Sequence, residues 1–289
     1  MTSEQATRLG LSTRSQISPY LEACCLRVSA TVSYAHAEQD IAVYTGMRVS
    51  AKTQQRLVQR QAWKELEPRA PETIQEMSID GGNVRLTSGT QDEPDWRQYK
   101  AVRLNGKGES RAWFQNNAAL VATVSARPMA EVVVCLGDGH DGIWNLHEQI
   151  VASSEQRIEI LDWYHLKENL FKLSSDAIDR EQIEAQLWKG EVSAALAELE
   201  VCPSDETERF RNYLLKHQHR IPNYNYYATE ELCSIGSGAV ESLVKQIDQR
   251  LQLVGSRWKA EHVPKVLAQR CAYLNEELNP TTSIILSRR

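Results

Sequence analysis

The sequence predicts an α/β protein, with a sheet flanked by helices, a helical block late in the chain and a helical module at the start. Two short apolar runs that end in Asp-Gly, within "SIDGG" (78–82) and "CLGDG" (135–139), are typical of buried strands. Helical spacing of apolar residues dominates 1–70, and 176–222 is largely helical and charged. A chain of 289 residues is long enough for one such core and a smaller module.

Residues 1–70 are predicted to form the helical module. Apolar residues recur at helical spacing in "ISPYLEACCLRVSATVSYAHAEQDIAVY" (17–44), Gly46 interrupts the pattern, and Ser50 is a candidate N-cap for a second helix. The result is a loose helix-turn-helix pattern, with a solvated face on a small bundle as the alternative. On the DNA-binding interpretation the second helix would present Lys52, Gln54, Gln55, Arg56 and Arg60. The proline-containing stretch "LEPRAPET" (66–73) is the predicted linker to the domain at 71–289.

The domain at 71–289 is predicted to begin with three strands, at 73–80, 96–104 and 111–114. A helix (116–126), a strand (131–138), a helix (142–152), a strand (157–162) and a helix (163–175) follow. After the charged helical block, "IGSGAVESLVKQIDQR" (235–250) predicts a helix that starts at a Gly-Ser-Gly turn, and 260–278 predicts the last helix.

Three carboxylates stand at chemically informative places in these elements. Asp80 and Asp138 are predicted to end strands, and Glu241 lies in the first turn after Gly-Ser-Gly. Open α/β sheets place their sites at such strand ends, and converging carboxylates repel each other unless a cation lies between them. Two divalent ions about 4 Å apart would serve an in-line displacement at phosphorus. Alternatively, each Asp is a turn residue and Glu241 only interacts with the helix dipole.

The Gly-Ser-Gly turn itself does not predict a nucleotide site. No Lys-Ser/Thr follows the glycines as a P-loop requires, so we expect no small-molecule cofactor. Gly236 and Gly238 are expected to let the chain turn and pack tightly, with Ser237 as a candidate cap. We therefore interpret the turn as the segment that positions Glu241 at the start of the helix.

Taken in order, "SIDGGNV", "VVVCLGDGHDGIWNL", "IEILDWYHLKENL", "IGSGAVESLVKQIDQRL" and "VGSRW" resemble the DDE transposases of bacterial insertion sequences, in particular the ISKra-like branch. The resemblance implies a ribonuclease-H-like mixed sheet flanked by helices, with a helical insertion at about 166–232 before the last catalytic helix. It also implies that Asp80, Asp138 and Glu241 hold Mg²⁺ or Mn²⁺, as two ions. His165 aligns with the histidine of an Asp/Cys-x-x-His motif, where it would contact a phosphate or orient a nucleophile; otherwise it is a hydrogen-bonded residue at a helix start. Asp162 would be the N-cap of that helix.

The activity that the resemblance implies is hydrolysis of a phosphodiester at the end of an insertion sequence, followed by transfer of the freed strand into target DNA. Because two DNA ends must be joined, a homodimer is expected. One alternative is a truncated, catalytically idle remnant that binds DNA or a transposase subunit. Another is a metal-dependent phosphohydrolase that uses Asp138, His140 and Asp141.

DNA contact has to depend on local clusters, since the net charge is −5. Residues 250–270 are locally basic, and an Arg-Trp pair can follow a backbone and stack on an unpaired base; the alternative is a core Trp beside a solvated Arg. The candidates here are Lys245, Arg250, Arg257, Trp258 and Lys259, with Lys245 and Arg250 lining a DNA channel. Lys245 is also placed to form an intrahelical pair with Glu241.

The remaining composition is that of an ordinary globular protein. No apolar run approaches the roughly 20 residues of a membrane span, and the polar N-terminus has no signal-peptide core, so a cytoplasmic protein is expected. The six cysteines are scattered without a CxxC pair, which predicts reduced thiols and no zinc site.

Overall fold

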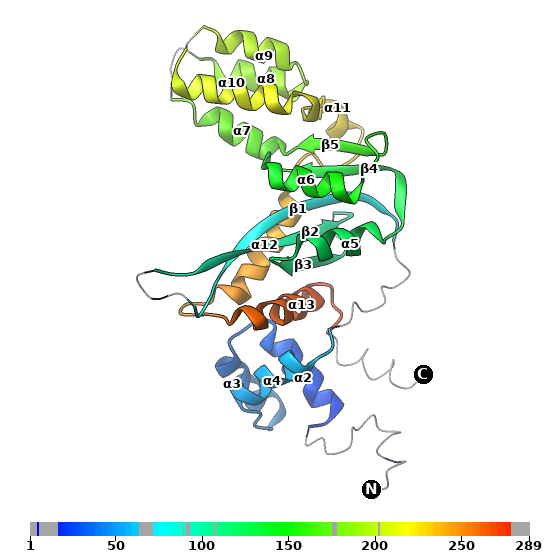
Figure 1. The fold of residues 1–289 in the computed structure, drawn as a ribbon, viewed down its shortest axis with the longest axis vertical. Helices are drawn as coiled ribbons and strands as arrows, with labels where there is room; N and C mark the ends of the chain where they lie inside the picture. The colour runs from blue at the N-terminus through cyan, green and yellow to red at the C-terminus, as the bar shows by residue number, and fades with distance from the viewer. Residues whose placement is uncertain are drawn as a thin grey trace.

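A five-stranded mixed sheet forms the centre of the protein in the computed structural model (Figure 1). The structure describes residues 5, 17–63, 72–88, 90, 93–106, 108–174, 178–201 and 203–278. The strands are β1 (Ile74–Arg85), β2 (Trp96–Leu104), β3 (Ser110–Phe114), β4 (Met129–Gly137) and β5 (Arg157–Leu161). Their order is β3-β2-β1-β4-β5, with β1, β2 and β3 antiparallel and β4 and β5 parallel to β1. The predicted sheet flanked by helices is confirmed.

Helices cover both faces of this sheet. The helices before and beside the sheet are α2 (Pro19–Ser29), α3 (Tyr34–Thr45), α4 (Ala51–Arg60), α5 (Asn117–Ser125) and α6 (Asp141–Ile150). The later ones are α7 (Trp163–Phe171), α8 (Arg180–Trp188), α9 (Val192–Leu199), α10 (Asp205–His217), α11 (Tyr224–Thr229), α12 (Gly238–Leu251) and α13 (Val263–Leu274), with short 3₁₀ turns η1 (Gln218–Arg220) and η2 (Ala260–His262).

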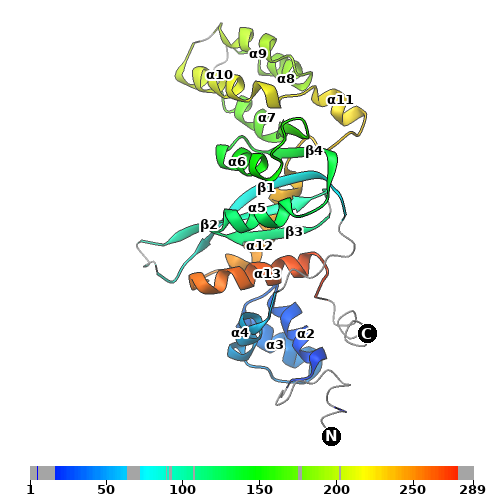
Figure 2. The ribbon, with the colours of Figure 1, turned by 45° about the vertical axis from the view of Figure 1, so that its right-hand side comes forward.

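The alternation of side chains along β2 shows which helices lie on which face. Tyr99 and Ala101 are buried in one apolar cluster with residues of α12 and α13. Val102 and Leu104 are buried in another cluster with residues of α5 and α6. Because successive side chains of a strand point to opposite faces, the sheet is a middle layer between these two helix pairs (Figure 2).

Strand β1 is longer than the sequence predicts. Asp80 does not end it, because β2 continues to pair with β1 from Asp80 to Arg85. The parallel pairing with β4, in contrast, stops at Ser78. Asp80 therefore lies in mid-strand, but just beyond the last residue of β1 that pairs with β4.

Gly82, two residues after Asp80, allows close packing and does not form a turn. A Cβ on Gly82 would lie 2.3 Å from the phenol oxygen of Tyr99, so only glycine leaves room for that ring. The Tyr99 hydroxyl donates a hydrogen bond to Asp248 on α12 (2.8 Å). Gly82 thus allows a tyrosine of the sheet to reach the helix that carries Glu241.

The N-terminal module is a bundle of α2, α3 and α4. The continuous helical stretch predicted at 17–44 is two helices, because Ala30 ends α2 and the Ser33 side chain caps α3. Gly46 ends α3 in the left-handed conformation, and Ser50 caps α4 by accepting from the Thr53 N–H, so both predicted signals are confirmed. Buried residues of the module share one apolar cluster with α12 and α13. The predicted linker at 66–73 lies largely outside the described residues.

The predicted late helical block is present as α7 to α11. It lies at the end of the molecule opposite the N-terminal module in both ribbon views (Figures 1 and 2). The block has its own apolar cluster, which extends to the ends of β4 and β5. Within it the ring of Trp163 lies 4.8 Å from Trp188 and 5.0 Å from Tyr224, so aromatic packing joins the start of α7 to α8 and α11.

In the described part of the chain, no helix is both long and apolar enough to cross a membrane. The cysteines that the structure describes are free thiols, as predicted: Cys24, Cys25, Cys135, Cys233 and Cys271. Cys202 lies outside the described residues.

We expect acid to destabilise the fold through His147. Its ring is fully buried, Nε2 donates to the Leu136 carbonyl (3.0 Å), and burial lowers the pKa of His147 from 6.5 to about 4. The unfolded chain therefore binds a proton below about pH 6.5 that the folded chain binds only near pH 4. This contribution to the free energy of unfolding is present above pH 6.5 and falls by about 2 kcal/mol between pH 7 and pH 5.

Urea unfolding at the two pH values measures this effect. His147→Gln should reduce the pH dependence by that amount, whereas His36→Gln, at an exposed position, should leave it unchanged. An unaltered pH dependence in His147→Gln would contradict the assignment.

Candidate active site

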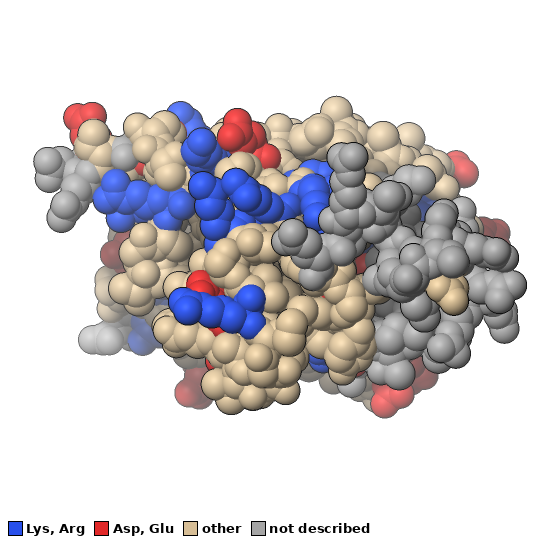
Figure 3. Space-filling view, turned by 90° about the horizontal axis from the view of Figure 1, so that it is seen from below, with Lys and Arg blue, Asp and Glu red and all other residues tan. Residues whose placement is uncertain are grey.

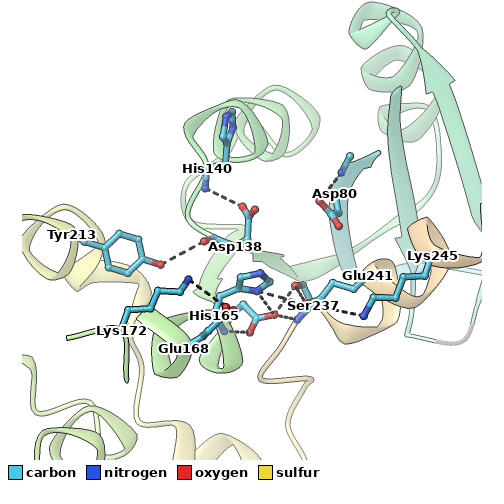
Figure 4. Close-up of polar contacts among 12 residues, drawn as sticks. Asp80, Asp138, His140, His165, Glu168, Lys172, Tyr213, Ser237, Glu241 and Lys245 are labelled. Atoms are coloured by element: carbon cyan, nitrogen blue, oxygen red, sulfur yellow. Dashed lines mark hydrogen bonds and ion pairs between the residues drawn. The ribbon is translucent and has the colours of Figure 1, made fainter. Parts of the chain in front are cut away.

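The carboxylates predicted from the sequence meet at one cleft (Figure 4). Asp80, Asp138, His165 and Glu241 line a cavity of about 230 Å³, although they come from β1, the end of β4, α7 and α12. The other lining residues are Ile79, Ser237, Val244 and Lys245. Sequence positions up to 161 residues apart (241 − 80) thus contribute to one site.

Pairing of the parallel strands brings Asp80 and Asp138 to the same level of the sheet. Ser78 is opposite Leu136, so two further residues along each strand give Asp80 and Asp138 (78 + 2 and 136 + 2). The His140 N–H donates to Oδ1 of Asp138 (2.9 Å), which holds that carboxylate at the start of the loop to α6.

The arrangement of this loop argues against the phosphohydrolase alternative. The His140 ring accepts a hydrogen bond from the Gly142 N–H (3.0 Å) and so caps α6. Asp141 pairs with Lys216 of α10 (2.6 Å). The side chains of Asp138, His140 and Asp141 therefore have separate partners, and they are not among the described residues grouped closely enough to hold a metal ion. Figure 4 shows Asp138 and His140.

The environment of Asp80 disfavours its ionised form. Burial raises the pKa of Asp80, and the nearby charges of Asp138 and Glu241 raise it further. The Gly81 N–H and Lys100 act in the opposite direction. A partly buried carboxylate that is repelled by two others favours the binding of either a proton or a cation. The residues present therefore fit a site for a hard divalent cation.

Glu241 is placed by the turn before α12. A Cβ on Gly236 would lie 2.6 Å from the Tyr164 ring, so the predicted tight packing is confirmed there; Gly238 has open space around it, so the prediction is wrong at that position. Ser237 does not cap α12 with its side chain. Its hydroxyl instead donates to the buried Asp162 carboxylate and lies 3.2 Å from Oε1 of Glu241.

Asp162 is the N-cap of α7, as predicted, and it has a second role that the sequence did not reveal. It accepts from the His165 N–H (3.0 Å) and also from the N–H and hydroxyl of Ser237. Although burial opposes it, these contacts lower the pKa of Asp162 to about 2. Ser237 lies 75 residues later, and no local signal in either segment indicates the contact.

Asp162, His165 and Glu241 form the tightest group of possible metal ligands among the described residues. One ligand atom from each lies within 4.8 Å of the others, so the group could hold a metal ion. Asp80 and Asp138 line the same cleft but are not in this group. The oxygens of Asp162 already accept several hydrogen bonds, so we assign it to supporting the site.

His165 supplies a positive charge to the cleft. Its Nδ1 lies 3.6 Å from Asp162 and 3.5 Å from Glu241. The contact with Asp162, reinforced by the charges of Glu241 and Asp138, raises the pKa of His165 to about 9. The ring is therefore an imidazolium at neutral pH. The His165 side chain is 35% exposed and lines the cleft.

Lys245 lies one turn after Glu241 at the mouth of the cleft. Its Nζ is 4.0 Å from Oε2 of Glu241, so the intrahelical pair considered from the sequence is present. The Lys245 side chain is 78% exposed and is free to move toward a bound anion.

Two predicted DNA-binding residues are core residues instead. Arg250 is buried, donates to the Ser29 carbonyl (2.7 Å), and its guanidinium lies 4.9 Å from the Tyr34 ring and 5.0 Å from the Trp258 ring. Trp258 is buried and donates its indole N–H to the Leu251 carbonyl (2.8 Å). The predictions of a DNA channel lined by Arg250 and of base stacking on Trp258 are therefore wrong. The reason is that this end of α12 packs against the N-terminal module. The local excess of basic residues in the sequence does not indicate this packing.

The other DNA candidates differ in exposure. Gln54 is buried and bonds to the Val49 carbonyl, so its expected presentation to DNA is wrong. Gln55 is half-buried, and Arg60 pairs with Glu22 (2.9 Å). The exposed basic candidates are Lys52, Arg56, Arg60, Lys245, Arg257 and Lys259.

The chain matches no model of a known protein family and no curated protein. Its function has to follow from the site, in which three carboxylates, an imidazolium and a serine hydroxyl surround one cleft.

Arg250 and Arg257 form a matched pair of a buried and an exposed arginine. We expect Arg250→Ala to lower the free energy of unfolding by about 3 kcal/mol, because it removes a buried hydrogen bond and the contacts with two rings. Arg257→Ala should change it by no more than about 0.5 kcal/mol. Chemical denaturation of the two variants checks the difference, and equal stabilities would contradict the core assignment of Arg250.

Proposed function

We propose that the protein is a DDE-type DNA transposase, which hydrolyses a phosphodiester at the end of an insertion sequence and transfers the freed strand to target DNA. The observation that carries the proposal is the convergence of Asp80, Asp138 and Glu241 on one cleft, where burial and then the charges of its two acidic neighbours raise the pKa of Asp80. This cleft favours a divalent cation and an anionic substrate that approaches with it.

The donor set indicates which cation would suit the cleft. Asp80, Asp138 and Glu241 offer only oxygen, the ligand that Mg²⁺ and Mn²⁺ prefer. When bound, two such ions would stabilise charge on the attacking and leaving oxygens of a displacement at phosphorus. Asp162 supports this set by anchoring Ser237 and the N–H of His165.

The proposed reaction consists of two displacements of the same kind. In the first, a water oxygen forms a bond to phosphorus while the bond from phosphorus to the 3′-oxygen breaks, and the 3′-oxygen leaves as a hydroxyl. In the second, that hydroxyl oxygen forms a bond to a phosphorus of the target, and the 3′-oxygen of the target leaves. Because both place extra negative charge on phosphate oxygens, one cleft could serve both.

His165 has a defined part in this proposal. In the metal-free cleft the contact with Asp162 raises the pKa of His165 to about 9, so the ring there is a hydrogen-bond donor at neutral pH. Its charge can stabilise a phosphate oxygen in the cleft, as a fixed donor close to Glu241. Of the two roles considered from the sequence, the phosphate contact is therefore the one we propose.

DNA would also contact the N-terminal module through α4. Lys52 and Arg56 are exposed on this helix, one turn apart. Figure 3 shows the end of the molecule that carries α2, α3 and α4, where Lys and Arg side chains form a band across the face. Positive charge is thus concentrated at this end of the molecule, although the net charge of the whole chain is −5. Because two DNA ends have to be joined, we propose that two copies act together.

Metal-dependent nicking of supercoiled plasmid DNA tests the proposed activity. Asp138→Asn should reduce the Mg²⁺- or Mn²⁺-dependent rate by about 100-fold or more, because it removes a carboxylate charge that would hold the divalent cation. Asp205→Asn, an exposed position at the start of α10, should nick like the wild type. Equal trace nicking by wild type and Asp138→Asn would reject the enzyme and favour a DNA-binding remnant.

Fluorescence anisotropy with duplex DNA tests the proposed role of α4. The double variant Lys52→Ala/Arg56→Ala should bind more weakly and reduce the slope of log affinity against log salt by about 2, roughly 0.9 for each lost phosphate contact. Lys189→Ala, an exposed lysine in the helical block, should leave both quantities unchanged. A salt slope equal to that of the wild type would place the DNA elsewhere.

A further inference from the structure

Helix α10 of the helical block contacts the loop that carries Asp138. The hydroxyl of Tyr213 donates to the backbone carbonyl of Asp138 at 3.4 Å, across 75 residues of sequence (Figure 4). The partly buried Tyr213 ring packs between two others, with Phe210 stacked on it (6.3 Å) and His217 edge-on (4.8 Å). A side chain of the block thus reaches the backbone of a residue that lines the cleft.

The next residue in the loop, Gly139, has no side chain and so leaves room for the Tyr213 ring. Gly139 has φ +98°, a conformation that side-chain-bearing residues rarely adopt. A Cβ at this position would lie 2.9 Å from the Tyr213 hydroxyl and 3.0 Å from its ring. Glycine in "LGDG" therefore meets two needs at once, the turn of the backbone and the close approach of Tyr213.

A second contact from the same side of α10 holds the other end of the loop. Lys216, three residues after Tyr213, pairs with Asp141 at the first position of α6 (2.6 Å). The Tyr213 and Lys216 side chains of α10 therefore contact both ends of the loop between β4 and α6.

These contacts limit how the Asp138 carboxylate can point. The Tyr213 hydroxyl contacts the carbonyl of Asp138 at 3.4 Å, and the His140 N–H donates to its Oδ1 at 2.9 Å, so the backbone and one carboxylate oxygen each have a partner. A carboxylate fixed in this way loses little conformational freedom when it binds an ion. Without the contact from α10, the glycine at 139 would leave the loop free to turn.

We infer that Tyr213 is a positioning residue for Asp138, and that α10 of the helical block is a brace that holds this carboxylate ready for a divalent cation. The inference rests on the proposed function. It assigns to the helical block a direct effect on the metal affinity of the site.

Direct Mn²⁺ binding by calorimetry, without DNA, tests the inference on the full chain. Tyr213→Phe keeps the ring and removes the hydroxyl, and it should weaken Mn²⁺ binding by roughly 10-fold, the scale for loss of a group that orients a ligand. The Mn²⁺ concentration for half-maximal plasmid nicking should rise by the same factor, while the rate at saturating Mn²⁺ stays near that of the wild type. Tyr226→Phe, at a tyrosine that is 54% exposed on α11, is the matched control and should bind like the wild type.

The melting temperature separates positioning from a general loss of structure. Tyr213→Phe should melt close to the wild type, and Lys216→Ala, whose side chain is half exposed, provides a second variant of the same brace with the same expected direction. Wild-type Mn²⁺ affinity in both variants would overturn the inference. If Asp138→Asn abolishes binding and nicking in that case, only the inference fails. If Asp138→Asn also binds and nicks like the wild type, the proposed function fails as well.

Discussion

The buried carboxylate of Asp162 is the interaction on which the arrangement of the cleft depends. It begins α7 by accepting from the His165 N–H, and it holds the turn before α12 by accepting from Ser237. The Trp163 N–H donates to the Ile235 carbonyl (3.0 Å) and strengthens the same junction. One fully buried acid therefore fixes where two helices start, and with them His165 and Glu241. An unpaired charge at this depth would be costly, and its hydrogen bonds are the reason that it is tolerated.

The opposite end of α12 is held by the sheet and the N-terminal module. Tyr99 reaches Asp248 through the space that Gly82 leaves, and Arg250 extends into the module to the Ser29 carbonyl. Arg270 of α13 donates to the Gln246 carbonyl in the same region (2.7 Å). Two arginines are thus used to join helices, which is possible because their guanidinium groups find carbonyl oxygens and aromatic rings.

The electrostatic design of the molecule separates these buried cations from the anionic cleft. At the cleft the acids exceed the bases, and His165 and Lys245 are the cations that line it among the described residues. Among the exposed basic DNA candidates, Lys52, Arg56 and Arg60 lie on α4, and Arg257 and Lys259 lie between α12 and α13. Under the proposed function, DNA would be held at the module while its reacting phosphate lies in the acidic cleft.

By itself the sequence determined the succession of strands and helices along the chain and several of the residues at which they begin or end. Short apolar runs and helical periodicity located the strands, and Ser50 and Gly46 marked helix ends, because these signals act within a few residues. The spacing of Asp80, Asp138 and Glu241 indicated three residues of one cleft, since the parallel strand β4 ends at the level of Asp80. Only the tertiary structure decided that β1 continues past Asp80, that Arg250 and Trp258 are core residues, and that Asp162 and Tyr213 support the site. Each of these depends on which other segment packs against the residue. For the end of β1 that segment is the neighbouring strand β2. For Asp162 and Tyr213 the partner lies 75 residues away and for Arg250 it lies 221 residues away, and such a partner leaves no local pattern in the chain.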